Sequence, residues 1–290
     1  MDLKTILLTF DVEDWFQVEN FKDYIPFSSW NDHELRVEKN IHLILDLLDS
    51  FSFQPKATFF VLGWIARKLP AMVKEIHKRG HEVASHGNLH HLCTTLSLTA
   101  AKQDIKDGKA LLEDIIDHEV FGYRAPSFAI NNDILKVIKD TGHVYDSSYN
   151  SFSMHKRYGT LNLPANAKKD AAYKMSDNFF ELPISNLTIN QKTFPLGGGG
   201  YFRLIPFPLF KRGMNWVLNK DKAFLFYSHP WEFDPDQPRV EQASTSFKFR
   251  HYINLNQTQE KLESLIKNFN NLKFTSCIDY LHDLCATHQT

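Results

Sequence analysis

The chain has 290 residues, and its 33 basic side chains nearly balance 34 acidic ones, for a formal net charge of -1. This balance argues against binding of nucleic acid or of an anionic membrane surface through overall charge. Hydrophobic residues make up 43% of the chain, which excludes disorder and allows a large core. Three cysteines exclude a disulfide framework, so metal ligands are expected among the fourteen histidines.

Short apolar runs alternate with longer amphipathic segments in the first half of the chain. Runs of this kind are typical of strands buried on both faces. We expect strands at 6–10, 57–62, 82–85, 120–123 and 143–145, and helices at 34–48, 65–79, 97–116 and 132–141. Ser97 is the expected N-cap of the third helix.

The segment 148–178 is polar and without periodicity, and it predicts an irregular loop. Beyond it we expect strands at 179–183, 201–205, 223–227 and 272–274, and helices at 208–218, 258–268 and 278–285. The alternation of strands and helices indicates an α/β fold with parallel strands. Since no linker or repeat interrupts the pattern, residues 1–290 are predicted to form a single domain.

Three carboxylates, Asp11, Glu13 and Asp14, follow the first predicted strand within four positions. Such repelling charges at the end of a buried strand are costly unless a cation compensates them, which suggests a metal. An aspartate that caps a helix, beside solvated charges in a loop, is an equal alternative.

His86 and His90 follow the strand at 82–85 and are four residues apart, a separation that lets two imidazoles bind one ion. Parallel strands present their carboxyl ends at the same edge of a sheet, so these histidines and the first carboxylates are expected to meet. Two imidazoles and one carboxylate are typical of hydrolytic zinc sites, although iron, cobalt or nickel also accept them.

Two further strand ends carry ionisable side chains. Arg124, two residues before Pro126, is placed to grip a carboxylate, and His229 is placed where a general acid is needed. A surface salt bridge for Arg124 and a core position for His229 are the alternatives.

Several residues beside these motifs are candidates for contact with a substrate. Aromatic rings stack on sugars and glycines allow close approach of the backbone, although a core position or a flexible hairpin explains each of them equally well. The substrate-binding candidates are Trp15, Tyr123, Pro126, Gly199, Tyr201 and Trp231.

Taken together, the motifs resemble those of the NodB-type polysaccharide deacetylases, carbohydrate esterase family 4. The resemblance rests on Thr9-Phe10-Asp11, Ser85-His86 with His90, Arg124 with Pro126, and Ser228-His229, and it extends from about residue 5 to 275. The segments FDVEDWFQVENF, GHEVASHG, FGYRAPSF and HPWEFDPDQPR resemble a subgroup associated with bacterial exopolysaccharide and PEP-CTERM loci. That subgroup lies in the allantoinase-like and peptidoglycan-deacetylase-like branch.

The resemblance implies a distorted (β/α) barrel of about seven parallel strands and metal-dependent N-deacetylation. It implies that Asp11 is the general base, Arg124 its orienting partner and His229 the general acid, with His86 and His90 as metal ligands. The family has two adjacent aspartates at the first motif, whereas Val12 follows Asp11 here. We favour Asp14 as the third ligand, with Glu13 as the alternative, and Asp146 is the candidate for the family's acid-tuning aspartate.

These interpretations predict a zinc-dependent hydrolase acting on an N-acetylated sugar of a bacterial surface polysaccharide or exopolysaccharide, or on its lipid-linked or nucleotide-linked precursor. The N-terminal segment has no signal-peptide pattern and the chain no membrane-spanning run, so we expect a cytoplasmic protein. Homo-oligomerisation stays open. The alternatives are hydrolysis of another C–N bond, as in allantoin or an imide, and a non-catalytic carbohydrate-binding protein.

Overall fold

The sheet is organised around β1 (Thr5–Val12), all eight residues of which are buried. The structure is a computed structural model that describes residues 4–152 and 158–286. Within this part of the chain, seven strands are consecutive parallel neighbours, in the order β11 (Ala223–Ser228), β1, β2 (Ala57–Val61), β3 (Glu82–Ser85), β4 (Gly122–Tyr123), β5 (Tyr145–Asp146) and β8 (Phe179–Glu181). This parallel order confirms the predicted α/β class.

Five more strands extend or flank this parallel core. β12 (Lys273–Phe274) pairs with the start of β1, and β7 (Ala172–Ser176) and β6 (Lys168–Lys169) continue the sheet antiparallel to β8. β9 (Asn186–Ile189) and β10 (Lys192–Pro195) form a separate hairpin. The path from β8 back to β11 is bridged where Tyr227 N donates to Gly197 O at 2.7 Å and Gly197 N donates to Ser185 O at 2.8 Å. The sheet therefore curls into the distorted barrel that was expected.

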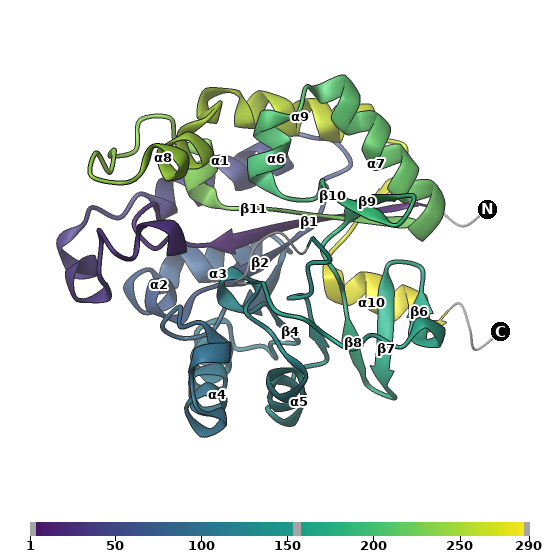
Figure 1. Cartoon of the computed structure of the whole chain (residues 1–290), viewed down its shortest axis with the longest axis horizontal. Helices are drawn as coiled ribbons and strands as arrows, with labels where there is room; N and C mark the ends of the chain where they lie inside the picture. Colours follow the sequence, from purple (N-terminus) through teal and green to yellow (C-terminus); the bar gives the residue numbers. More distant parts are fainter. Residues whose placement is uncertain (1–3, 153–157, 287–290) are drawn as a thin grey trace.

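Helices lie around the curled sheet, and α8 stands at the carboxyl end of β1 and β11 (Figure 1). Apolar faces of α1, α3, α7 and α9 bury one core cluster against the sheet, together with alternate side chains of β1 such as Ile6, Leu8 and Phe10. The helices are α1 (Val37–Asp49), α2 (Gly63–Lys68), α3 (Pro70–Lys78), α4 (Leu98–Ile116), α5 (Asn132–Asp140), α6 (Gly199–Leu204), α7 (Phe207–Asp221), α8 (Thr245–Tyr252), α9 (Thr258–Asn268) and α10 (Cys277–Ala286).

The opposite end of the barrel is closed by α10. The first backbone N–H groups of this helix need acceptors, and the strands supply them. Cys277 N donates to Thr58 Oγ1 at 2.8 Å, and Ile278 N donates to Glu82 Oε2 at 3.1 Å. One end of the barrel is thus sealed, and the other end is left for a site.

Several expected elements differ in the structure. The segment 201–205, expected as a strand, belongs to helix α6. The helix expected at 65–79 is divided into α2 and α3, because Pro70 has no N–H to continue α2. Part of the loop expected at 148–178 forms β6 and β7.

None of the helices in the described residues is both long and apolar enough to cross a membrane.

Candidate metal and catalytic site

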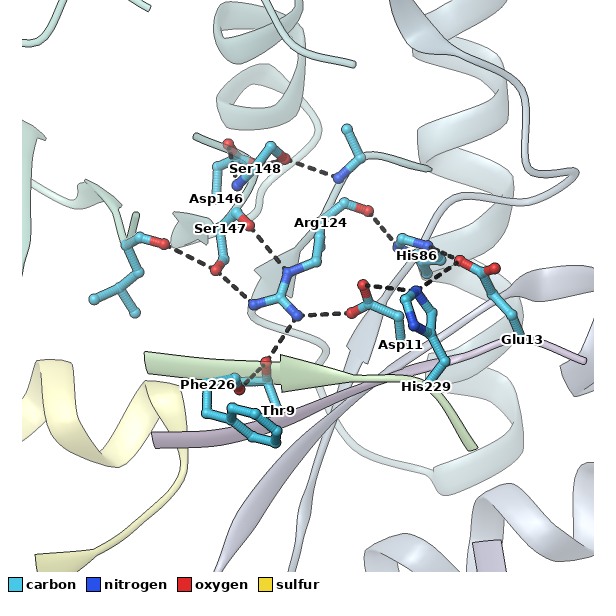
Figure 2. Close-up of polar contacts among 12 residues, drawn as sticks. Thr9, Asp11, Glu13, His86, Arg124, Asp146, Ser147, Ser148, Phe226 and His229 are labelled. Carbon is cyan, nitrogen blue, oxygen red and sulfur yellow. Dashed lines mark hydrogen bonds and ion pairs between the residues drawn. The ribbon is translucent and has the colours of Figure 1, made fainter. Parts of the chain in front are cut away.

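The polar residues singled out from the sequence gather at the carboxyl ends of four strands of the parallel sheet. Asp11 lies near the end of β1, and His86, Arg124 and His229 directly follow β3, β4 and β11. Figure 2 shows their side chains converging above the strand ends. Parallel pairing brings residues far apart in sequence to one edge, as the strand pattern predicted.

Glu13, His86 and His90 form a compact group of metal-ligand atoms. The Nε2 atoms of His86 and His90 each lie 3.0 Å from Oε1 of Glu13, and all three side chains are buried. The three donor atoms lie within 4.8 Å of one another. His90 has a positive φ of 59°, a backbone conformation that is costly for a residue other than glycine and marks functional sites.

The chemistry of this donor set fits a divalent cation. Nδ1 of His86 donates to the carbonyl oxygen of Arg124 at 2.8 Å, which fixes the ring orientation and directs the Nε2 lone pair towards Glu13. Two imidazole nitrogens and a carboxylate oxygen are thus aimed at one point, and a cation there gives all three a partner. One carboxylate and two imidazoles, with a position left open, is the ligand set of catalytic zinc sites.

Asp14, favoured from the sequence as the third ligand, lies outside this group. Its Oδ2 accepts hydrogen bonds from the backbone N–H groups of Arg36 at 2.7 Å and Val37 at 2.9 Å, and its Oδ1 accepts from Trp15 N at 2.8 Å. Asp14 therefore caps the start of α1. Burial raises the pKa of Asp14 to about 6, against the effect of these hydrogen bonds.

Arg124 holds Asp11 in a buried ion pair. Its Nη1 donates to Asp11 Oδ1 at 2.7 Å and to Thr9 Oγ1 at 2.8 Å, and neither charged side chain is exposed to a significant degree. The guanidinium carbon also lies 4.0 Å from the centre of the Phe60 ring. These contacts leave Asp11 in one orientation.

A turn after β5 fixes the remaining N–H groups of Arg124. Nε donates to Ser147 O at 3.0 Å and Nη2 donates to Ser147 Oγ at 2.8 Å. Ser148 Oγ accepts from Ala125 N at 2.8 Å and donates to Asp146 Oδ1 at 2.6 Å (Figure 2). The sequence pattern of Tyr145–Ser148 did not indicate this role. Asp146, which was expected to tune the acid, belongs to this turn instead.

His229 faces the two carboxylates from the other side. Its Nε2 lies 4.0 Å from Asp11 Oδ2 and 4.0 Å from Glu13 Oε1, and its Nδ1 lies 2.9 Å from Glu232 Oε1. Burial by itself lowers the pKa of His229, but the hydrogen bond to Glu232 and the nearby carboxylates outweigh it and raise this pKa to about 9.

Glu232, which the sequence analysis missed, occupies the place expected for the acid-tuning aspartate. Its Oε2 accepts from Arg203 Nε at 2.7 Å, and both side chains are buried. Its position three residues after His229 was the available signal. A Cβ on Gly199 would lie 2.3 Å from Glu232 Oε1, so Gly199 gives space to Glu232 and does not face a substrate.

A cavity of about 350 Å³ opens beside Asp11, Glu13 and His229. Of the six residues predicted to contact substrate, Tyr201 and Trp231 line this cavity, and the other four do not. Trp15 and Tyr123 are buried in core clusters, and Pro126 is buried as well. Aromatic residues beside a motif are more often part of the core, and that alternative holds for these two rings.

Comparison with known proteins places the chain in a family. A family model for polysaccharide deacetylase matches residues 1–145, half of the chain. The chain belongs to the polysaccharide deacetylase family. A second model, for a domain of unknown function (DUF3473), matches residues 147–281. Both matched segments contribute to one site, since Asp11, His86 and Arg124 come from the first and His229 from the second.

Individual relatives agree with this membership of the deacetylase family. The peptidoglycan-N-acetylglucosamine deacetylase of Bacillus cereus is 32% identical over 100 residues, which are 34% of this chain and 46% of that protein. The chain spans less than half the length of the curated relatives it matches.

Solved structures show that the deacetylase-family fold is shared. A protein from Mycobacterium smegmatis assigned to the polysaccharide deacetylases superimposes with a TM-score of 0.62 at 18% identity, over 99% of this chain and 92% of that one. Puue allantoinase superimposes with a TM-score of 0.61 at 13% identity, over 99% and 91% of the two chains. At these identities the likeness is one of fold.

Proposed function

We propose that this chain is a metal-dependent hydrolase that removes N-acetyl groups from an N-acetylated sugar, with zinc as the ion. The observation that carries the proposal is the placement of Asp11 and His229 in the lining of one cavity, 4.0 Å apart, with the Glu13, His86 and His90 donor set beside them. Hydrolysis of an amide needs a base for water and an acid for the leaving amine, and these residues supply both.

Asp11 is the proposed base. Its Oδ1 is engaged by Arg124, which leaves Oδ2, 4.0 Å from Nε2 of His229, to accept the proton of the attacking water. Arg124 keeps Asp11 aimed, because its Nη1 donates to Oδ1 and thereby fixes the orientation of the carboxylate. A divalent ion bound by Glu13, His86 and His90 supplies a Lewis acid for the acetyl carbonyl and acidifies the water.

His229 is the proposed acid. Its Nε2 donates a proton to the nitrogen of the departing amino sugar, while Glu232 holds Nδ1 and thereby fixes the plane of the ring. Cleavage of the amide C–N bond by one water gives acetate and the free amine. Trp231 stacks on His229 with ring centres 5.0 Å apart, so the ring has little freedom to turn away.

The substrate class follows from the family and from the motif resemblance. We propose an N-acetylated glycan of a bacterial surface polysaccharide or exopolysaccharide, or its lipid-linked or nucleotide-linked precursor. The relatives named for peptidoglycan support a glycan substrate, and the resemblance of HPWEFDPDQPR to the exopolysaccharide and PEP-CTERM subgroup supports the narrower choice.

Acetate release from a panel of substrates tests the proposal. The panel contains N-acetylated oligosaccharides, lipid-linked and nucleotide-linked N-acetyl sugars, and allantoin, each with and without a chelator. We expect acetate from a glycan, loss of activity with chelator and recovery with Zn²⁺. Hydrolysis of allantoin alone, or undiminished acetate release after removal of metal, contradicts the proposal.

A further inference from the structure

The cavity extends from the catalytic residues to a wall formed by two helices outside the sheet. We call this the α6–α8 wall, and it consists of Tyr201, Leu204, Phe249, Arg250 and Ile253. The wall belongs to the part of the chain matched by the domain of unknown function. Its side chains differ in character from the acidic and imidazole groups at the inner end of the cavity.

Arg250 carries a charge that no carboxylate balances. The acidic groups lining the cavity all have partners: Asp11 pairs with Arg124, Glu13 with two histidines, Glu19 with Lys22 and Glu232 with Arg203. Arg203, the other arginine that lines the cavity, forms an ion pair with Glu232. Among the residues that the structure describes, the exposed guanidinium of Arg250 has no acidic partner.

Arg250 and Tyr201 both line the cavity, one from each helix of the wall. The two helices are joined where Nη2 of Arg203 donates to the carbonyl oxygen of Arg250 at 3.2 Å. A guanidinium and a phenol hydroxyl in one cavity wall offer several N–H and O–H donors to a bound acceptor. Carboxylate and phosphate groups are the acceptors that arginine binds best, through paired hydrogen bonds.

Apolar surface lies open beside this cation. Leu204 is 47% exposed and Phe249 is 57% exposed, although both are large hydrophobic side chains. Aromatic and aliphatic surface next to a polar group is suited to the apolar face of a sugar ring.

The inner part of the cavity lining also has polar atoms without partners. Trp231 Nε1 and His251 Nδ1 are buried and have no hydrogen-bond partner among the described residues. Buried polar atoms without partners are rare in native proteins and call for a ligand, water or ion to complete them. Both residues line the same cavity as Arg250.

We propose that the α6–α8 wall is a subsite for a sugar residue that carries an acidic substituent, adjacent to the residue that loses its acetyl group. Arg250 and Tyr201 bind the acidic group, and Phe249 and Leu204 contact the ring. The inference rests on the proposed deacetylase function and narrows its substrate to an acidic glycan. The acidic substituent is a carboxylate on a sugar of the glycan, or a phosphate of a lipid-linked or nucleotide-linked precursor.

Gly200 provides a direct test of whether substrate occupies this part of the cavity. A Cβ on Gly200 meets nothing within 4 Å, and Gly200 lines the cavity. We expect Gly200→Phe to fold with an unchanged melting temperature and to raise KM about tenfold or more, because the new ring fills the subsite. An unchanged KM in the folded variant overturns the proposal.

Arg250→Gln tests the preference for an acidic substrate. Matched N-acetylated oligosaccharides are compared: one neutral, one with a neighbouring uronic acid and one linked to a diphosphate. We expect Arg250→Gln to lower kcat/KM for the preferred acidic substrate about tenfold or more, through KM, and to leave the neutral substrate unchanged. The acidic compound that responds identifies the source of the anion. Arg212→Gln, on the exposed side of α7, is the matched control and leaves both unchanged.

Binding of the same oligosaccharides, measured by calorimetry on metal-free protein, separates failure of this inference from failure of the proposed function. If the wild type binds acidic glycans more tightly and Arg250→Gln loses that preference while no acetate is released, the subsite stands and the catalytic proposal fails. Equal affinity of wild type and Arg250→Gln for acidic and neutral glycans overturns the subsite, whether or not acetate is released.

Discussion

Glu13 and Asp14 are adjacent in sequence and have different tasks. β1 ends at Val12, and the side chain of Glu13 falls on the same side as Asp11, as alternation along a strand requires. Asp14 comes one residue later and faces the start of α1, where it accepts from the backbone N–H groups of Arg36 and Val37. The structure therefore brings Glu13, the alternative ligand, to the histidines, and it gives Asp14 a capping role.

The two positions should respond differently to removal of charge. We expect Glu13→Gln to weaken Zn²⁺ binding by more than about 100-fold. Loss of a residue that only hydrogen-bonds to a metal ligand already lowers metal affinity by up to about 100-fold. Asp14→Asn should keep the metal and lose about 1 kcal/mol of stability, because its carbonyl still accepts hydrogen bonds but without charge. Metal titration and urea unfolding of both variants measure this. Loss of metal in Asp14→Asn alone contradicts the assignment.

Asp11→Asn should separate catalysis from metal binding. An amide cannot accept the proton from water, so we expect acetate release to fall about 10²- to 10⁴-fold. Zn²⁺ affinity should be unchanged, because the donor atoms belong to Glu13, His86 and His90. The measurement is kcat together with metal content. Full activity with metal bound shows that another group is the base.

At the scale of elements, the turn after β5 supports the site through its hydrogen bonds to Arg124. Asp146 and Glu181 face each other across β5 and β8, and both carboxyl groups are buried. Burial and the neighbouring Asp146 raise the pKa of Glu181 well above its ordinary value, which favours the protonated form of Glu181, the form that can donate to Asp146. Asp146 then holds Ser148, and Tyr149 N donates to Glu181 Oε1 at 2.9 Å.

Substitutions of Glu181 test whether this proton orients Arg124. Glu181→Gln keeps both an acceptor and a donor, and we expect near-normal kcat. Glu181→Leu removes both, and we expect kcat to fall about tenfold or more through a misplaced Arg124, with little change in KM. Rescue by glutamine is the decisive comparison, since equal loss in both variants means that the carboxyl itself is required.

The same pair predicts how stability depends on pH. A carboxyl whose pKa is raised on folding binds a proton that the unfolded chain has released, so the free energy of unfolding falls as pH rises from the ordinary pKa through the folded one. We expect the wild type to lose stability as pH rises above 4.5, the ordinary pKa of glutamate, and Glu181→Gln to lose less, because the amide has no proton to release. Urea unfolding across this range provides the measurement.

The elements differ in how much of them could be predicted from sequence. The strand at 82–85, the helix at 258–268 and the N-cap Ser97 are confirmed, because each has a strong local pattern. Helix α6 was expected as a strand because its aromatic residues favour strands locally, whereas packing on α9 and β11 decides its structure. Glu181 contacts the turn after β5, away from the metal-ligand motifs, so local pattern did not identify its role, whereas Glu232 had one local signal, its position three residues after His229.

On the scale of the whole molecule, buried histidines link folding to acid. Burial lowers the pKa of His143 to about 3 and that of His81 to about 4, and Nε2 of each has no partner among the described residues. Below pH 6.5 the unfolded chain takes up protons at these positions and the native protein does not, so the free energy of unfolding falls as pH decreases towards 4.

His143→Asn should reduce this acid sensitivity. Asparagine places a polar atom near the position of Nδ1, which contacts Thr141 Oγ1 at 3.0 Å, but it does not titrate. We expect the slope of unfolding free energy against pH to decrease by about 1.4 kcal/mol per pH unit between pH 4 and 6. His282→Asn, at an exposed position on α10, should leave the slope unchanged. An unaltered slope in His143→Asn contradicts a neutral buried ring.

The position of β1 between distant partners has a consequence for synthesis of the protein. β1 is translated before two of its partners, because its neighbour on one side is β11 and its starting residues also pair with β12 (Figure 1). Until Ala223–Ser228 has been translated, the nascent chain carries an apolar strand with one open edge, which is a template for association with other chains. The order in which the strands are made therefore leaves this edge of β1 unpaired until β11 follows it.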